Sequence, residues 1–153
     1  MKPFKPANGD HTAADFDGLP WLPPDVQASL GAVVSLIVES FPGYVSRIGL
    51  YGSWQRGKAR PESDVDIAVF LAQDVSWFDA ERGIVDQSAA RKDKQQWHAV
   101  EKKVNRECED SRAYSVAFVA PAMMAYYAAR GPIHLQNWVE ALRTCHILWR
   151  SHA

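Results

Sequence analysis

The residues best suited to chemistry are a glycine, a serine and two aspartates within one short segment. Gly52 and Ser53 are followed, after ten intervening residues, by Asp64 and Asp66. Two aspartates spaced two apart on a strand project from the same face, so both carboxylates can bind one divalent cation. Without a cation, such carboxylates repel each other, whereas Mg²⁺ bridging them to phosphate oxygens removes that cost. The segment therefore predicts metal-assisted phosphate chemistry, against the alternative of a Gly-Ser turn beside two surface aspartates.

The Gly-Ser pair has the properties of a phosphate-binding turn. Gly52 follows an expected strand over 44–51 and can adopt backbone conformations closed to other residues, which lets a phosphate approach the backbone. Ser53 is expected to begin a short helix over 54–60, whose free N–H groups and dipole favour an anion. Polar side chains near this turn are expected to bind the nucleotide, namely Arg56, Lys58 and Ser63, with Gln55 and Arg60 beside them. The alternative for the basic side chains is a solvated turn.

Alternating strand and helix patterns surround the motif and predict a layered fold with both helices and strands. Residues 1–24 are rich in proline and predict an irregular arm, whereas 25–153 predict a single domain. Ser76 is expected to cap a segment that begins at Trp77. The expected strands span 44–51, 64–71, 113–119 and 145–149, and the expected longer helices span 25–41, 92–110, 122–129 and 135–142.

Composition narrows the class of protein. The 153 residues, 47% of them hydrophobic, are enough for one domain with a sizeable core. Seventeen Lys and Arg against eighteen Asp and Glu leave a net charge of -1, which disfavours general binding to nucleic acid or anionic membranes. The longest apolar stretch, Leu30–Val38, is too short to span a bilayer, and 1–24 lacks a secretory apolar region, so a cytoplasmic location is expected. Cys108 and Cys145 lack metal-ligand or redox spacing.

The motif resembles the G-S-x10-D-x-D pattern of the minimal nucleotidyltransferases (MNT), a small stand-alone branch of the DNA polymerase beta nucleotidyltransferase superfamily. Gly52, Ser53, Asp64 and Asp66 match that pattern without an insertion. The resemblance is good over residues 46–71 and extends more weakly to 119. It implies an α+β fold, in which a mixed β-sheet has helices packed on one side.

The resemblance also implies a reaction. Asp64 and Asp66 would hold Mg²⁺ or Mn²⁺, and a nucleoside triphosphate, expected to be ATP, would bind at Gly52 and Ser53. An acceptor hydroxyl would attack the α-phosphate and pyrophosphate would leave, with metal ions stabilising the charge that develops. The function expected is therefore that of a nucleotidyltransferase.

The family pattern usually includes a third carboxylate on the next strand, which helps to hold a second metal and accepts the acceptor's proton. The expected strand over 113–119 contains no acid, and the matching position is Ser115. Asp110, just upstream beside Glu109, is the alternative if the strand register differs by several residues. Two hypotheses follow: an enzyme completed by Ser115 or Asp110, or a catalytically weak or inactive nucleotide-binding and partner-docking module of the same fold.

The acceptor is expected to come from a partner, because larger relatives use an extra domain to grip theirs. Many MNT proteins pair with a HEPN-domain protein as toxin and antitoxin, and some of these antitoxins adenylylate a tyrosine of the toxin. By analogy, we expect antitoxin-like transfer to a HEPN-type partner protein. The alternative is a module that uses an apolar surface to dock a partner or to form a homo-oligomer.

Overall fold

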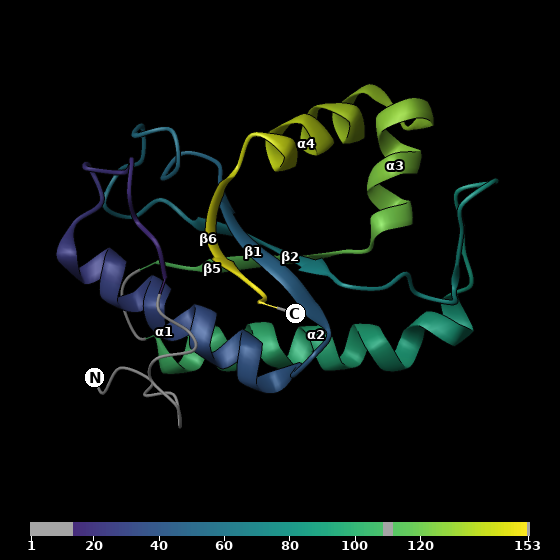
Figure 1. The fold of residues 1–153 in the computed structure, drawn as a ribbon, viewed down its shortest axis with the longest axis horizontal. Helices are drawn as coiled ribbons and strands as arrows, with labels where there is room; N and C mark the ends of the chain where they lie inside the picture. The colour runs from purple at the N-terminus through teal and green to yellow at the C-terminus, as the bar shows by residue number, and fades with distance from the viewer. Residues whose placement is uncertain (1–13, 109–111, 153) are drawn as a thin grey trace.

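The computed structural model describes residues 14–108 and 112–152, and a four-stranded β-sheet lies at its centre (Figure 1). The strand order is β5-β2-β1-β6. β1 pairs antiparallel with both β2 and β6, whereas β2 pairs parallel with β5. The predicted mixed sheet and α+β class are therefore confirmed. The strands are β1 (Val45–Tyr51), β2 (Val65–Leu71), β5 (Tyr114–Val119) and β6 (His146–Arg150).

Helices cover both faces of this sheet. On one face, α1 (Pro24–Ser40) and α2 (Gln87–Glu107) enclose the main hydrophobic core, as the prediction of helices on one side expected (Figure 1). On the other face lie α3 (Pro121–Arg130) and α4 (Ile133–Arg143), which the prediction did not place there (Figure 1). They pack there because this face has its own buried apolar cluster, made of Ala68, Phe70, Val119 and Leu142. None of the described helices is both long and apolar enough to cross a membrane.

The alternation of side chains along β2 decides which face each residue serves. Val65, Ile67 and Val69 are fully buried in the main core with α1 and α2. Ala68 and Phe70 belong to the cluster with α4. Asp66 has the same parity as Ala68, so its carboxylate lies on the face that α3 and α4 partly cover.

The segment between β2 and α2 has a different secondary structure from the predicted one. The expected cap at Ser76 is wrong, since 78–85 form a small hairpin of β3 (Phe78–Asp79) and β4 (Ile84–Val85). The chain reverses there because Gly83 adopts a φ of +67°. The cap of α2 is Asp86, whose carboxylate accepts a hydrogen bond from the Ala89 N–H at 3.2 Å.

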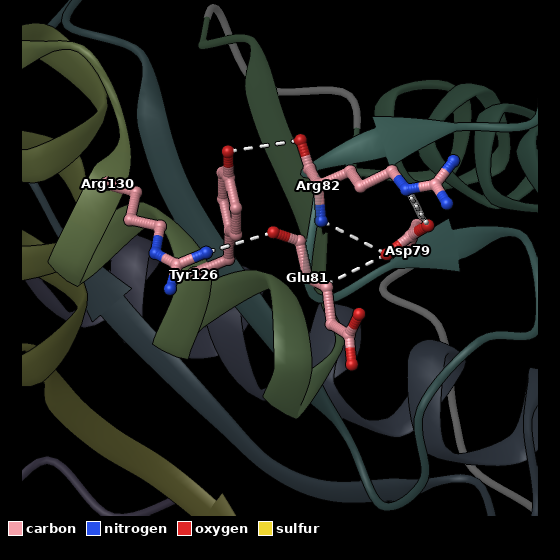
Figure 2. Close-up of polar contacts among 5 residues, drawn as sticks. All are labelled: Asp79, Glu81, Arg82, Tyr126 and Arg130. Carbon is pink, nitrogen blue, oxygen red and sulfur yellow. Dashed lines mark hydrogen bonds and ion pairs between the residues drawn. The ribbon is translucent and has the colours of Figure 1, made fainter.

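The hairpin is attached to α3 by polar contacts (Figure 2). The Tyr126 hydroxyl donates to the Arg82 carbonyl at 3.2 Å, and the Arg130 guanidinium donates to the Glu81 carbonyl at 2.9 Å. Within the turn, the Asp79 carboxylate accepts from the backbone N–H groups of Glu81 and Arg82. Two side chains of α3 therefore hold the backbone of a turn that is more than forty residues away in sequence.

A side chain of α2 forms hydrogen bonds with backbone groups on the outer edge of β5. The Asn105 amide accepts a hydrogen bond from the Tyr114 N–H at 2.7 Å and donates to the Tyr114 carbonyl at 3.0 Å. We expect Asn105→Ala to lower the free energy of unfolding by about 1–3 kcal/mol, because two backbone groups beside a buried residue lose their partner. Urea denaturation measures the loss. The control is Asn137→Ala on α4, an exposed position without a side-chain hydrogen bond among the described residues; equal losses would contradict the prediction.

Candidate functional site

Three side chains form a row across the sheet. Tyr51 on β1 lies directly opposite Asp66 on β2, and Asp66 lies directly opposite Ser115 on β5. Residues that face each other across paired strands project from the same side of a sheet. Asp64 immediately precedes β2, and its charge acts on Asp66. The structure therefore brings Asp64, Asp66 and Ser115 together.

Gly52 packs directly against this row. Its φ is +79°, and a Cβ at this position would overlap the Oδ2 atom of Asp66. Only glycine fits both the left-handed backbone and the close approach of the carboxylate. The strand exit that the sequence predicted therefore lies beside Asp66, the one of the two aspartates that belongs to β2.

The predicted helix over 54–60 is wrong. The chain forms hydrogen-bonded turns instead, in which the Arg56 N–H donates to the Gly52 carbonyl and the Lys58 N–H donates to the Ser53 carbonyl. A helix cannot continue because Gly57 adopts a φ of +71° against the ring of Trp21. A helix dipole at Ser53 consequently makes no contribution to anion binding.

The two aspartates fit a divalent cation. Burial raises the pKa of Asp66 above its usual value, the Asp64 charge raises it further, and Arg56 opposes the shift. Ionised Asp66 is therefore costly unless a positive charge accompanies it. Among residues 14–108 and 112–152, no group of three or more His, Cys, Asp or Glu could hold a metal. Mg²⁺, however, is commonly held by one or two carboxylates together with substrate phosphates, which is the donor set present here.

The predicted nucleotide-binding residues have different surroundings. Arg56 and Lys58 are exposed on the turn, and Arg56 is close enough to act on Asp66. The Ser63 hydroxyl accepts from the Arg60 N–H at 2.8 Å, and its carbonyl accepts from the indole of the buried Trp54 at 2.9 Å. Ser63 therefore stabilises the turn. Asp110, the alternative third carboxylate, lies outside the described residues.

Tyr51 is a site residue that the sequence interpretation missed. It packs, together with Trp138 of α4 and Cys145, against the apolar cluster of Ala68, Phe70, Val119 and Leu142. Burial raises the pKa of Tyr51, Trp138 opposes the shift, and the Asp66 charge adds to it, so the phenol stays protonated at neutral pH. The available signal was its place directly before Gly52, at the end of a strand whose alternate residues face the site.

A cavity of about 730 Å³ lies at the opposite end of the sheet. Tyr44, just before β1, and Leu71, at the end of β2, line it, whereas the aspartates are at the other end of these strands. Its carboxylates already have partners: Asp74 accepts from a backbone N–H of α3, and Asp93 accepts from the Trp77 indole. We therefore assign the candidate site to the Asp66 row.

The close approach at Gly52 leads to a prediction. We expect Gly52→Ala to lower the free energy of unfolding by about 1–2 kcal/mol, because a Cβ is strained at this φ and displaces the Asp66 carboxylate. The matched control is Gly31→Ala, since Gly31 lies in α1 with nothing within 4 Å of an added Cβ; alanine there stabilises the helix by about 1 kcal/mol. Thermal and urea denaturation of both variants measure the difference. A Gly52→Ala variant as stable as the wild type would contradict the prediction.

Comparison with known proteins agrees with the geometry. A family model described as a nucleotidyltransferase domain matches residues 33–121. That span includes Gly52, Ser53, both aspartates and Ser115, together with β1, β2, α2 and β5. No curated protein matches the chain.

Proposed function

The chain belongs to the nucleotidyltransferase domain family, and from this premise we propose that it transfers a nucleoside monophosphate from ATP to a hydroxyl group in a reaction that depends on Mg²⁺ or Mn²⁺. Transfer from a nucleoside triphosphate is the general reaction of the family. The observation that supports a working site here is the pair of aspartates beside Gly52, in which Asp66 is half-buried and repelled by Asp64.

In this proposal, each group near the turn has a task. Asp64 and Asp66 hold the cation, which supplies positive charge for the phosphates when bound. Gly52, which has no side chain, lets the Asp66 carboxylate lie against the backbone beside Ser53, where a phosphate would bind. Arg56 and Lys58 bind phosphate oxygens from the exposed side of the turn. The close contact with Gly52 restricts the orientation of the Asp66 carboxylate that would hold the cation.

The transfer forms one bond and breaks one. The acceptor oxygen attacks the α-phosphorus, and the bond from that phosphorus to the bridging oxygen breaks, so pyrophosphate leaves with the electron pair. The proton of the acceptor hydroxyl passes to solvent, because Ser115 is not a base at neutral pH. We assign Ser115 the role of a neutral hydrogen-bonding group beside Asp66.

We propose a HEPN-type partner protein as the source of the acceptor hydroxyl, and the cytoplasm as the compartment. The resemblance to the MNT branch supports this partner, and the net charge of -1 disfavours a nucleic-acid acceptor. The test incubates the protein with α-labelled ATP, Mg²⁺ or Mn²⁺, and a HEPN-domain protein. We expect label on the partner, and none with Asp64→Asn/Asp66→Asn. Absence of label on the partner and on small hydroxyl acceptors with both metals would reject the proposal.

A second candidate function is a nucleotide-binding module that docks a partner without turnover. The observation that favours it is Ser115, a neutral residue, directly opposite Asp66 on β5. Metal-dependent ATP binding without transfer to any acceptor is the outcome expected of such a module. Transfer of label excludes it.

A further inference from the structure

Two arginines face each other on the same side of the sheet as Asp66. Arg47 on β1 lies directly opposite Arg150 on β6. Ile48 and Leu50, the neighbours of alternate parity on β1, are buried in the main core with α1. Arg47 therefore projects to the other face, where its guanidinium lies 4.1 Å from the centroid of the Phe70 ring. Arg150, in register with Arg47, projects to that face as well.

Among residues 14–108 and 112–152, the two arginines have no acidic partner. Like charges directly opposite each other on neighbouring strands are destabilising. Within the described residues, no carboxylate lies within 4.0 Å of either guanidinium, and the Nε atom of Arg47 is buried without a hydrogen-bond partner. The cation–π contact with Phe70 provides no hydrogen-bond acceptor in the ring plane for the guanidinium N–H groups of Arg47. An anion bridging the two arginines through their remaining N–H groups would relieve the repulsion.

Cys145 lies close enough to both arginines for their charges to act on its thiol. Its Sγ atom lies over Gly49, the residue between Arg47 and Tyr51 on the same face of β1. Burial raises the pKa of the Cys145 thiol, whereas the charges of Arg47 and Arg150 both lower it. Both guanidinium groups are therefore close to the part of the sheet above Gly49.

Arg47 and Arg150 are separated from the two aspartates along the direction of the strands. Arg47 precedes Tyr51 by four residues, which is about 13 Å along a strand. Tyr51 faces Asp66, and Cys145 lies between the arginines and Tyr51. One continuous face of the sheet thus has two arginines at one end and the two carboxylates at the other.

We propose that Arg47 and Arg150 form a binding site for a phosphate group. The fork of an arginine matches phosphate oxygens with two parallel N–H bonds, and two forks in register surround such a group from both strands. The distance from Asp66 favours a phosphate group carried by the partner protein over one of the nucleotide. That assignment rests on the proposed function, whereas the phosphate site itself does not.

The experiment titrates inorganic phosphate into ¹⁵N-labelled protein without metal or nucleotide. We expect saturable shifts of the Gly49 and Arg150 backbone amides, and a dissociation constant raised about tenfold or more in Arg47→Gln and in Arg150→Gln. Arg150 is exposed, so its substitution leaves the fold intact even if Arg47→Gln disturbs the contact with Phe70. The control is Arg91→Gln, which removes the same charge from an exposed position on α2. No saturable shift, or equal affinity in Arg150→Gln and the control, overturns the proposal.

A second arm identifies the source of the phosphate. ATP affinity in the presence of Mg²⁺ is measured for Arg150→Gln by calorimetry. Unchanged ATP affinity with weakened phosphate binding supports a phosphate carried by the partner protein, and weakened binding of both supports a phosphate of the nucleotide. Since the phosphate titration needs neither metal nor ATP, failure of ATP binding in the wild type rejects the nucleotidyl-transfer proposal without affecting the phosphate site.

Discussion

The Asp64→Asn/Asp66→Asn variant is expected to lose Mg²⁺-dependent ATP binding by at least about 100-fold, since even residues that only support metal ligands contribute about 10–100-fold to affinity. Neutral amides keep the size of the side chains and remove both charges that hold the cation. Calorimetric titration of ATP, with Mg²⁺ and then with a chelator, measures the effect. In the wild type, the chelator has the same result as the substitutions, because both remove the link between the aspartates and the phosphates.

The same substitutions leave the fold intact, and the pKa of Asp66 indicates why. This pKa is raised by burial and by Asp64, so the folded protein favours the protonated carboxyl. Folding stability contributed by this group is present at low pH and decreases as the pH rises through the ordinary pKa toward the raised one. At neutral pH without metal, ionised Asp66 therefore opposes folding. We expect the metal-free variant to melt at or above the wild-type temperature; a variant that binds ATP and Mg²⁺ as tightly as the wild type would remove the basis of the proposed function.

Ser115→Asp is expected to raise the rate of nucleotidyl transfer by about 100-fold or more, within the range that a positioned general base contributes. The substitution restores a carboxylate directly opposite Asp66, where it can accept the proton of the acceptor hydroxyl and add an oxygen ligand. Single-turnover transfer of label from ATP, at saturating Mg²⁺, measures the rate.

The control for this prediction is Ser115→Asn, which has a similar size and no charge. A third carboxylate beside Asp64 and Asp66 adds repulsion in the absence of a cation, so Ser115→Asp is expected to melt lower than Ser115→Asn without Mg²⁺. The difference decreases when Mg²⁺ is added, because the cation neutralises the cluster. Equal rates of transfer for Ser115→Asp and Ser115→Asn would contradict the prediction that a carboxylate at position 115 acts as a general base.

Much of the fold was predictable because strands and helices produce hydrophobic patterns over short stretches of sequence. The continuous apolar pattern over 64–71 predicted β2, and the helical spacing of apolar residues predicted α1 to within one residue at each end. By contrast, the hairpin over 78–85 is too short to produce a pattern, and it depends on contacts from Tyr126 and Arg130. The turn over 53–57 was predicted as a helix because the φ of Gly57 is not evident from residue type alone.

For the candidate site, the sequence alone was enough to identify the residues in β2 and in the segment that leads into it. The G-S and D-x-D residues were identified from their spacing, because the two-residue period of a strand predicts that two aspartates two apart project to one side. In the structure, Asp66 lies in β2 and Asp64 immediately precedes it. Only the tertiary structure decided that Ser115 and Tyr51 flank Asp66, and that Arg47 faces Arg150. The physical reason is register: which residues of two strands lie opposite each other depends on packing between segments far apart in sequence.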